Sequence, residues 1–508
     1  MASFPSNIEI RNVIPYWRSF REAVRHGEVA TLNKDAAIPV IPINTYIHDW
    51  NSLRTIAAGG DLLSAAIMNG QTQLPVVQEV SRFLLERPDE ISSQLRSAAQ
   101  RILYGKREVE VAKDSIEELL NNKDDLIRKI KLLKRYNSVY SLNPVSYVEL
   151  ASCYTQLGNV QKAQEMMDIA VRIAPNQRFV SRSAARLYMH LDDKDKAYYI
   201  LSHNECIKKD PWLLASEIAV RTADGRVSSR IENGIRLLSS DIIPYELSEL
   251  GSAVGTVEML HGSRKKARQA ISIATKSPND NGFAQAVWWA KYYGENIEFS
   301  KQNILQLYEA DSIEMLFQDE YDKSLSSAVK WLAQMPFSKR AALFASEVAY
   351  TYIKDYDVAN KILKVGLQAS PQDTMLLNNQ AYSCALQGDV AQAARTLSIL
   401  NAEMKKHDYN IREHVCYDAT CGLTEYRKGN PERGAELYQK AIVQAIDSKD
   451  EKLANLAMLN YIREEVQYNP SFDASILGHL DELVCENQKE ADQIKKDIRA
   501  IYKLKRES

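Results

Sequence analysis

The chain has 508 residues, 45% hydrophobic and 26% charged, a composition typical of a folded protein with a sizeable core. Its 64 basic and 66 acidic side chains leave a formal net charge of −2. The whole molecule therefore lacks the excess positive charge that drives binding to nucleic acid, and any such contact would have to be local. The six cysteines show no CxxC spacing, which favours reduced thiols and a cytoplasmic location over a secreted disulfide framework. No signal peptide or membrane span is expected, because the first residues lack a basic and apolar leader and no long uncharged apolar window follows.

The first 142 residues show no clear repeat. Two prolines, Pro39 and Pro42, lie in the β-prone run IPVIPINTYI, which predicts an extended entry segment because proline and the residue before it disfavour helix. The following stretch, HDWNSLRTIAAGGDLLSAAIMNG, predicts a helix, a break at GGD and a second helix.

Apolar residues at steps of three and four then predict helix at Ile116, Leu119, Leu126, Ile130 and Leu133. One interpretation is a seam that joins two copies of the chain. The other is a pair of ordinary amphipathic helices, broken near NNKDD and packed on the rest of the molecule. The seam is short, which favours the ordinary helices.

From about residue 143 the sequence repeats with a period of 34 residues. The recurring pairs are Ala151 and Ala185, Tyr154 and Tyr188, Ala163 and Ala197, Ala359 and Ala393, and Leu363 and Leu397. Small residues at this spacing let paired helices approach closely, while Gly158 and Pro175 stand where one helix ends and the next unit begins.

These residues resemble the tetratricopeptide repeat family, most clearly over 143–211 and 339–441. Its eight signature positions fall on Tyr147, Leu150, Ala151, Tyr154, Ala163, Met167, Ala170 and Pro175. The resemblance implies an all-α fold, a right-handed α-α superhelix of helix pairs. The expected division is a divergent helical region at 1–142, a solenoid with degenerate middle units at 143–448, and a C-terminal helical cap with a basic tail at 449–508.

In this family the concave groove binds partner proteins or peptides, so the resemblance implies a partner-binding site at the inward positions. On this chain they include Arg182, Arg186, His190, Phe344, Tyr352, Asn378 and Tyr382. The first three are spaced i, i+4 and i+8 on one helix face and predict a site for an acidic segment. The alternative is a solvated charged face. The aromatic and apolar positions favour a bound helix or extended peptide.

One family subtype, the clamp for an acidic chaperone tail, is not expected. It needs lysine and asparagine at set inward positions, where this chain has Val148 and Ser152 in one unit and Phe344 and Val348 in another. Only Asn379 matches a clamp position.

Catalytic signatures are weak. Arg21 and His26 have the R-x4-H spacing of a class of helical ribonucleases, yet the residue after the arginine is Glu22 instead of the usual Asn, Asp or His. Cys416 and Cys421, with His407 and His414 nearby, match no familiar zinc module. We expect no metal, no cofactor and no enzyme activity.

Three basic stretches, IRKIKLLKRY, SRKKAR and KKDIRAIYKLKRES, are the sequence basis for a rival class of nucleic-acid-binding proteins. The sequence as a whole favours a non-catalytic scaffold, adaptor or regulatory subunit. Within the binding class, the alternative is a ligand-sensing regulator of an associated enzyme.

Overall fold

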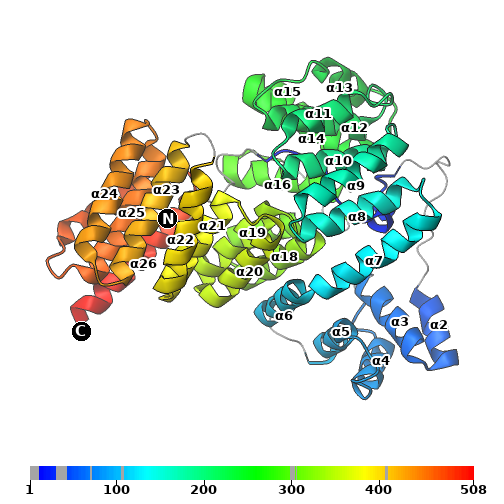
Figure 1. Ribbon diagram of the computed structural model, residues 1–508, viewed down its shortest axis with the longest axis horizontal. Coiled ribbons are helices and arrows are strands. Elements are labelled where there is room, and N and C mark those ends of the chain that lie inside the picture. The colour runs from blue at the N-terminus through cyan, green and yellow to red at the C-terminus, as the bar shows by residue number, and fades with distance from the viewer. Residues whose placement is uncertain are drawn as a thin grey trace. The chain divides into compact units, whose positions relative to one another are not determined.

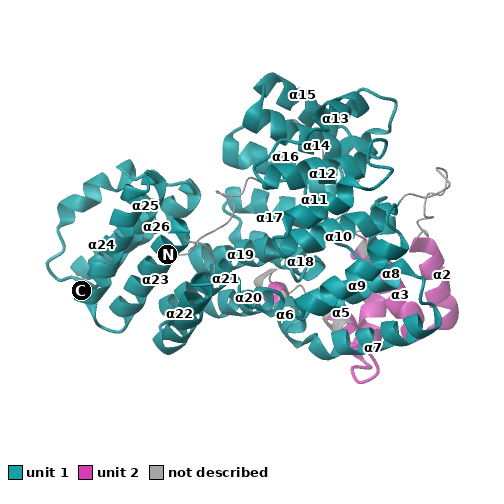
Figure 2. Ribbon diagram, turned by 45° about the horizontal axis from the view of Figure 1, so that its top comes forward, with its two compact units in different colours: residues 1–29, 115–508 teal, residues 30–114 magenta. Residues whose placement is uncertain are grey.

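The computed structural model describes residues 11–29, 43–68, 71–104, 108–297, 304, 306–406 and 410–507. Every regular element in these ranges is a helix, and consecutive helices pack as pairs (Figure 1), which confirms the predicted all-α class. The chain divides into two compact units, one comprising residues 30–114 and the other comprising 1–29 with 115–508 (Figure 2). The three-part division predicted from the sequence stays a prediction.

The smaller unit contains α2 (Ile43–Leu53), α3 (Ile56–Met68), α4 (Pro75–Leu85) and α5 (Ser93–Tyr104). Its core surrounds the fully buried Trp50. The predicted break at GGD is wrong, because α3 continues through it and the chain turns instead at Arg54, where φ is 50°. Gly59 serves packing: a Cβ there would lie 3.3 Å from the Trp50 ring. The predicted extended run is helical from Ile43 onward, while Pro39 and Pro42 lie outside the described residues.

The apolar steps after residue 108 form two helices, α6 (Glu108–Asn121) and α7 (Lys123–Val139). Ile116, Leu126 and Ile130 are buried within the chain itself, and α7 packs on α8 (Pro144–Gln156). This confirms the ordinary amphipathic helices. The continuous seam is wrong, because the helix is interrupted at Asn122.

The first clear repeat consists of α8 and α9 (Val160–Ile173), and the second of α10 (Arg178–His190) and α11 (Lys194–Ser202). Gly158 ends the first helix in the left-handed region with φ of 68°, and Asn159 caps the next by accepting a hydrogen bond from the Lys162 amide at 3.3 Å. Ala163 is fully buried at the contact between the paired helices. The predicted helix pairs are confirmed.

The middle units keep paired helices although their sequence signature fades. They are α12 (Pro211–Ala223), α13 (Ile231–Leu238), α14 (Pro244–His261), α15 (Arg264–Ala274), α16 (Asp280–Tyr293), α17 (Tyr308–Phe317) and α18 (Tyr321–Gln334). The later units comprise α19 (Lys339–Glu347), η2 (Val348–Ile353), α20 (Tyr356–Ala369), α21 (Thr374–Gln387), α22 (Val390–Met404), α23 (Ile411–Arg427), α24 (Pro431–Asp447) and α25 (Glu451–Tyr468).

The C-terminal region folds back onto these later units. A 3₁₀ helix, η3 (Ala474–Glu482), leads into α26 (Gln488–Glu507), which packs on α25 and on η2. Its apolar face joins the core cluster around Leu459 and Ile498. None of the described helices combines the length and apolarity needed to cross a membrane.

Candidate functional site: an inner surface that holds the N-terminal segment

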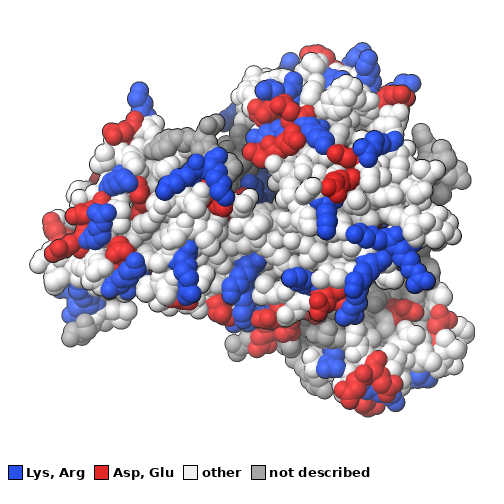
Figure 3. Space-filling model, viewed as in Figure 1, with Lys and Arg blue, Asp and Glu red and all other residues white. Residues whose placement is uncertain are grey.

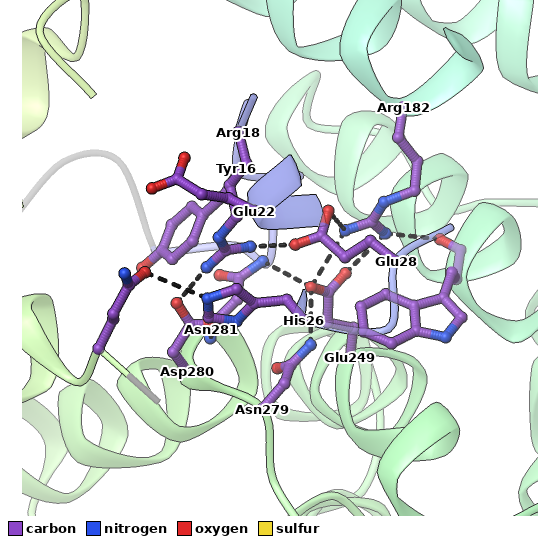
Figure 4. Close-up of polar contacts among 12 residues, drawn as sticks. Tyr16, Arg18, Glu22, His26, Glu28, Arg182, Glu249, Asn279, Asp280 and Asn281 are labelled. Carbon is purple, nitrogen blue, oxygen red and sulfur yellow. Dashed lines mark hydrogen bonds and ion pairs between the residues drawn. The ribbon is translucent and has the colours of Figure 1, made fainter. Parts of the chain in front are cut away.

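Residues 11–28, the N-terminal segment, lie against a surface formed by α10, α14, α16 and α17, which we call the inner surface. Figure 4 shows the contacts around Arg18 and Glu28 of the segment, with Arg182, Glu249 and Asp280 of the helices. The segment has no regular structure up to Ser19, which caps the short helix α1 (Phe20–Arg25). Gly27 then reverses the chain with φ of 65°. A segment with so little helix is nonetheless buried: Arg11, Trp17, Arg18, His26 and Glu28 are each no more than 4% exposed.

Arg11 is held by the most complete set of polar contacts in the segment. Its guanidinium donates to both carboxylate oxygens of Glu309 on α17, at 2.8 and 2.9 Å. It also donates to Gln285 at 2.8 Å and to Asn281 at 2.9 Å, both on α16. Fixed bidentate geometry of this kind is specific for arginine and not for lysine.

Glu309 is ionised because Arg11 is there. Burial alone would raise the pKa of Glu309, but the charge and hydrogen bonds of Arg11 outweigh it and lower that pKa to about 2. The phenol of Tyr16 donates a further hydrogen bond to the same carboxylate. Outside the segment, Arg340 is a further cationic neighbour of Glu309, at 3.5 Å.

Arg18 occupies a second acidic position. Its guanidinium pairs with Asp280 at the start of α16 and with Glu28 of the segment itself. Asp280 is 3% exposed, so its carboxylate depends on this cation for compensation.

Arg182 connects the segment to the helices. It donates to Glu249 of α14 at 2.8 and 3.2 Å, and a nitrogen of its guanidinium lies 3.6 Å from Glu28. Asn279 and Asn281 also donate to Glu249, at 3.1 and 3.2 Å. With 2% of Arg182 exposed, the alternative of a solvated charged face is wrong for this residue.

Arg186 and His190 belong to an aromatic part of the same surface. The Arg186 guanidinium lies 5.2 Å from the Phe337 ring centroid, and the rings of His190 and Trp17 lie 5.8 and 5.2 Å from that centroid. Burial, followed by the charge of Arg186, lowers the pKa of His190 to about 3. His190 is therefore neutral at pH 7 and adds no positive charge to the surface.

The structure thus brings Arg182, Arg186 and His190 to one surface, as their helical spacing predicts, and their assignment to a partner stays a prediction. Two of their contacts involve the N-terminal segment. Arg182 lies near Glu28 of the segment. Phe337, which contacts Arg186 and His190, also packs against Trp17 of the segment. No sequence pattern had indicated this occupant.

The other predicted groove residues lie on α19, η2 and α21 and have different neighbours. Phe344 packs against Trp331 at 6.3 Å and Tyr352 stacks on Tyr321 at 4.9 Å. Asn378 accepts a hydrogen bond from Thr420 at 3.0 Å. Tyr382 contacts Asn460 and Arg463, each at 3.1 Å. All four are at most 8% exposed, and their binding of a partner also stays a prediction.

Several residues of this site were missed by the sequence analysis. Arg11, Arg18, Glu249, Asp280 and Glu309 lie either before the repeats or in the degenerate middle units. The one available signal was the run of polar residues PNDNGF at the start of α16, which by itself predicts only a helix cap.

The ribonuclease spacing does not form an open pair. Arg21 is exposed on α1, whereas His26 is 4% exposed and its ring contacts Gln306 at 3.1 Å. Burial, followed by the charge of Arg18, lowers the pKa of His26. The ring is therefore buried between the segment and its neighbours Gln306 and Asp280.

Among the described residues, no group of three or more His, Cys, Asp or Glu side chains has a metal-binding arrangement. Cys416 is buried and Cys421 is partly buried, and burial raises the pKa of both thiols. His407 lies outside the described residues.

The basic stretches differ in their surroundings. In α15, Arg264 and Arg268 pair with Glu295, and in α26, Arg499 pairs with Asp481. On α7, Arg128 pairs with Asp125 and Lys129 with Glu149. The other exposed basic residues of this helix are Lys123, Lys131, Lys134 and Arg135. Figure 3 shows lysine and arginine side chains gathered over this helix.

Neither a protein-family model nor a curated protein sequence matches this chain. Solved structures with similar arrangements include yeast Tom70, with 15% identity over 78% of this chain and 96% of that chain and a TM-score of 0.31. The APC/C hetero-tetramer Cut9–Hcn1 has 12% identity over 90% and 92%, with a TM-score of 0.29. The structure of Naa15/Naa10 bound to HypK-THB has 11% identity over 89% and 80%, with a TM-score of 0.22. At these values the similarities carry no information about function.

The helix pairs and their 34-residue recurrence define the class of protein, an all-α, tetratricopeptide-like helical repeat. A fold of this class specifies no reaction, so the function has to be argued from the inner surface.

Proposed function

We propose that this chain is a non-catalytic interaction scaffold, an adaptor or regulatory subunit, whose inner surface binds an arginine-bearing protein segment. The observation that carries the proposal is the placement of Arg11 and Arg18 in buried acidic positions built by α16 and α17. The N-terminal segment is then an internal occupant of a peptide-binding surface.

The helices also contact the backbone of the segment, as expected for a surface that binds a polypeptide. Gln285 donates to the Arg11 carbonyl at 2.6 Å and Asn281 donates to the Ile14 carbonyl at 3.2 Å. Tyr245 donates to the His26 carbonyl at 2.9 Å, and Glu149 accepts from the Phe20 amide at 2.9 Å. Backbone contacts hold an extended chain whatever its sequence, and the acidic positions add selectivity for arginine.

An occupant on the same chain has a high effective concentration, so a partner segment must compete with it. A partner that displaces the N-terminal segment would change the state of the protein on binding. The proposal therefore includes the ligand-sensing regulator, in which exchange of the N-terminal segment for a partner on the inner surface is the regulatory change.

The test supplies the segment in trans. A labelled peptide of residues 11–29 is added to the chain that lacks residues 1–29, and binding is followed by fluorescence anisotropy. We expect saturable binding that Arg11→Ala with Arg18→Ala in the peptide weakens by about tenfold or more, because each removal takes a hydrogen-bonded cation from a buried carboxylate.

Arg21 and Arg25 provide the matched control, because both are exposed arginines of the same segment. A peptide with Arg21→Ala and Arg25→Ala should bind within about twofold of the unchanged peptide. Equal loss from the two double variants would mean unspecific charge attraction and would contradict the proposal. Circular dichroism of the shortened chain establishes that it remains folded.

The exposed basic face of α7 is the observation that favours the rival class, nucleic-acid binding. If that class is correct, the chain should retain a short RNA in a gel-shift assay at physiological salt and Lys131→Glu with Arg135→Glu should abolish that retention, because exposed cations dominate such binding. On the scaffold proposal, the unchanged chain shows no such retention at physiological salt.

A further inference from the structure

A cavity of about 320 Å³ lies between η2, α25 and α26, and its lining shares no residue with the inner surface. This volume is at the lower end of the roughly 300–1,000 Å³ typical of small-molecule sites. One wall is apolar and comes largely from the C-terminal helix, with Ile494, Ala500, Ile501 and Leu504.

The opposite wall is cationic. Lys354, Arg427 and Arg463 line the cavity, against the single carboxylate of Asp497. Lys354 pairs with Asp497. The two arginines share Glu464, Arg427 at 3.1 Å and Arg463 at 3.0 Å. Among these five side chains the cations outnumber the carboxylates by three to two, and Glu490 is a further acidic neighbour of Arg463 and Lys354.

Three buried polar groups of the lining residues have no hydrogen-bond partner within the described part of the chain. They are Nε of Arg427, Nη2 of Arg463 and the phenol oxygen of Tyr350. Arg463 is 6% exposed and Tyr350 is 1% exposed. Burial is the main cause that raises the pKa of Tyr350 well above its usual value, so the phenol stays protonated and can donate. Buried polar groups are rarely left unpaired in folded proteins.

Local backbone geometry places this wall. The chain widens into a π-helix over Val348–Ile353 and then takes a left-handed turn at Lys354, with φ of 64°. Turns of π-helix are rare in proteins, and those that occur are often found at functional sites. Here the turn contributes Tyr350, Thr351 and Lys354 to one cavity.

We infer that this cavity binds a small organic anion, with a phosphate or carboxylate head at Arg463 and Tyr350 and an apolar body against α26. The free guanidinium nitrogen and the phenol are donors at the head position, and the arginine geometry suits either anion. The aliphatic side chains of α26 would bury the apolar body of the ligand, and removal of that surface from water favours binding.

The full chain is titrated calorimetrically with phenyl phosphate and, separately, with phenylacetate, which distinguishes the two head groups. Benzyl alcohol is the neutral probe of similar shape, and inorganic phosphate is the head without a body. We expect one of the two organic anions to bind at micromolar to millimolar concentration, and both benzyl alcohol and inorganic phosphate to bind at least about tenfold more weakly.

Two variants locate the binding. Ala500→Trp fills the cavity from an exposed position on α26 and should weaken binding by about tenfold or more, whereas Ala391→Trp, at an exposed alanine of α22 outside the cavity, should leave it unchanged. Arg463→Lys keeps the charge but removes the unpaired Nη2 and should also weaken binding.

Binding of neither organic anion, equal binding of benzyl alcohol, or an unchanged affinity in Ala500→Trp would each overturn the inference. None of these outcomes bears on the peptide test of the inner surface, because the two sites share no residue.

Discussion

Glu490 on α26 and Glu347 on α19 are buried carboxyl groups, 5% and 3% exposed. Asn487 donates to Glu347 at 2.9 Å. Burial raises the pKa of Glu490 to about 7 although Arg463 and Lys354 lower it, and burial together with Glu490 raises the pKa of Glu347. Near neutral pH the native protein therefore holds protons on these groups that an unfolded chain would lose.

The sign of the resulting pH dependence follows from the raised pKa. The ordinary pKa of glutamate is 4.5 and that of native Glu490 is about 7, so the native state binds more protons between these values and the free energy of unfolding falls as pH rises through this window. We expect Glu490→Gln to flatten that fall, measured by urea unfolding at several pH values between 5 and 8. The exposed Glu482 gives the control variant Glu482→Gln, and an equal pH dependence in Glu490→Gln and the unchanged protein would contradict the assignment.

At the scale of one helix, the close contact between α8 and α9 depends on Ala163, which is fully buried. A leucine there has no space, so we expect Ala163→Leu to lower the free energy of unfolding by about 1–3 kcal/mol. Gln161→Leu, at an exposed position of the same helix, should change it by less than about 0.5 kcal/mol. Equal stabilities of the two variants, measured by urea unfolding, would mean that the helix contact is assigned to the wrong residues.

Sequence reasoning succeeds for the elements whose contacts are close along the chain. The pairing of α8 with α9 follows from Ala163 and Gly158, which are themselves part of the repeat. Sequence reasoning does not predict the contacts of the N-terminal segment, because the partners of Arg11 on α16 and α17 are 270 or more positions away along the chain. A single arginine carries no periodic signal for such a contact. For the same reason, the position of Arg182 on the inner surface was predictable and its buried partner Glu249 was not.

Within the larger unit, both ends of the described chain cover repeat helices. The N-terminal segment lies on α10, α14, α16 and α17, and α26 lies on α25 and η2. The N-terminal segment and α26 are held by different contacts, so we expect them to detach independently, because local stability follows local packing and hydrogen bonding.

Amide hydrogen exchange tests the central claim, that the N-terminal segment occupies and protects the inner surface. We compare the full chain with its Arg11→Ala, Arg18→Ala double variant, using Arg21→Ala with Arg25→Ala as the control for lost charge. We predict faster exchange in residues 11–28 and at the N-terminal ends of α16 and α17 in the first variant, while α21–α26 and the control stay unchanged. Unchanged exchange in the segment and at those helix ends would contradict the account.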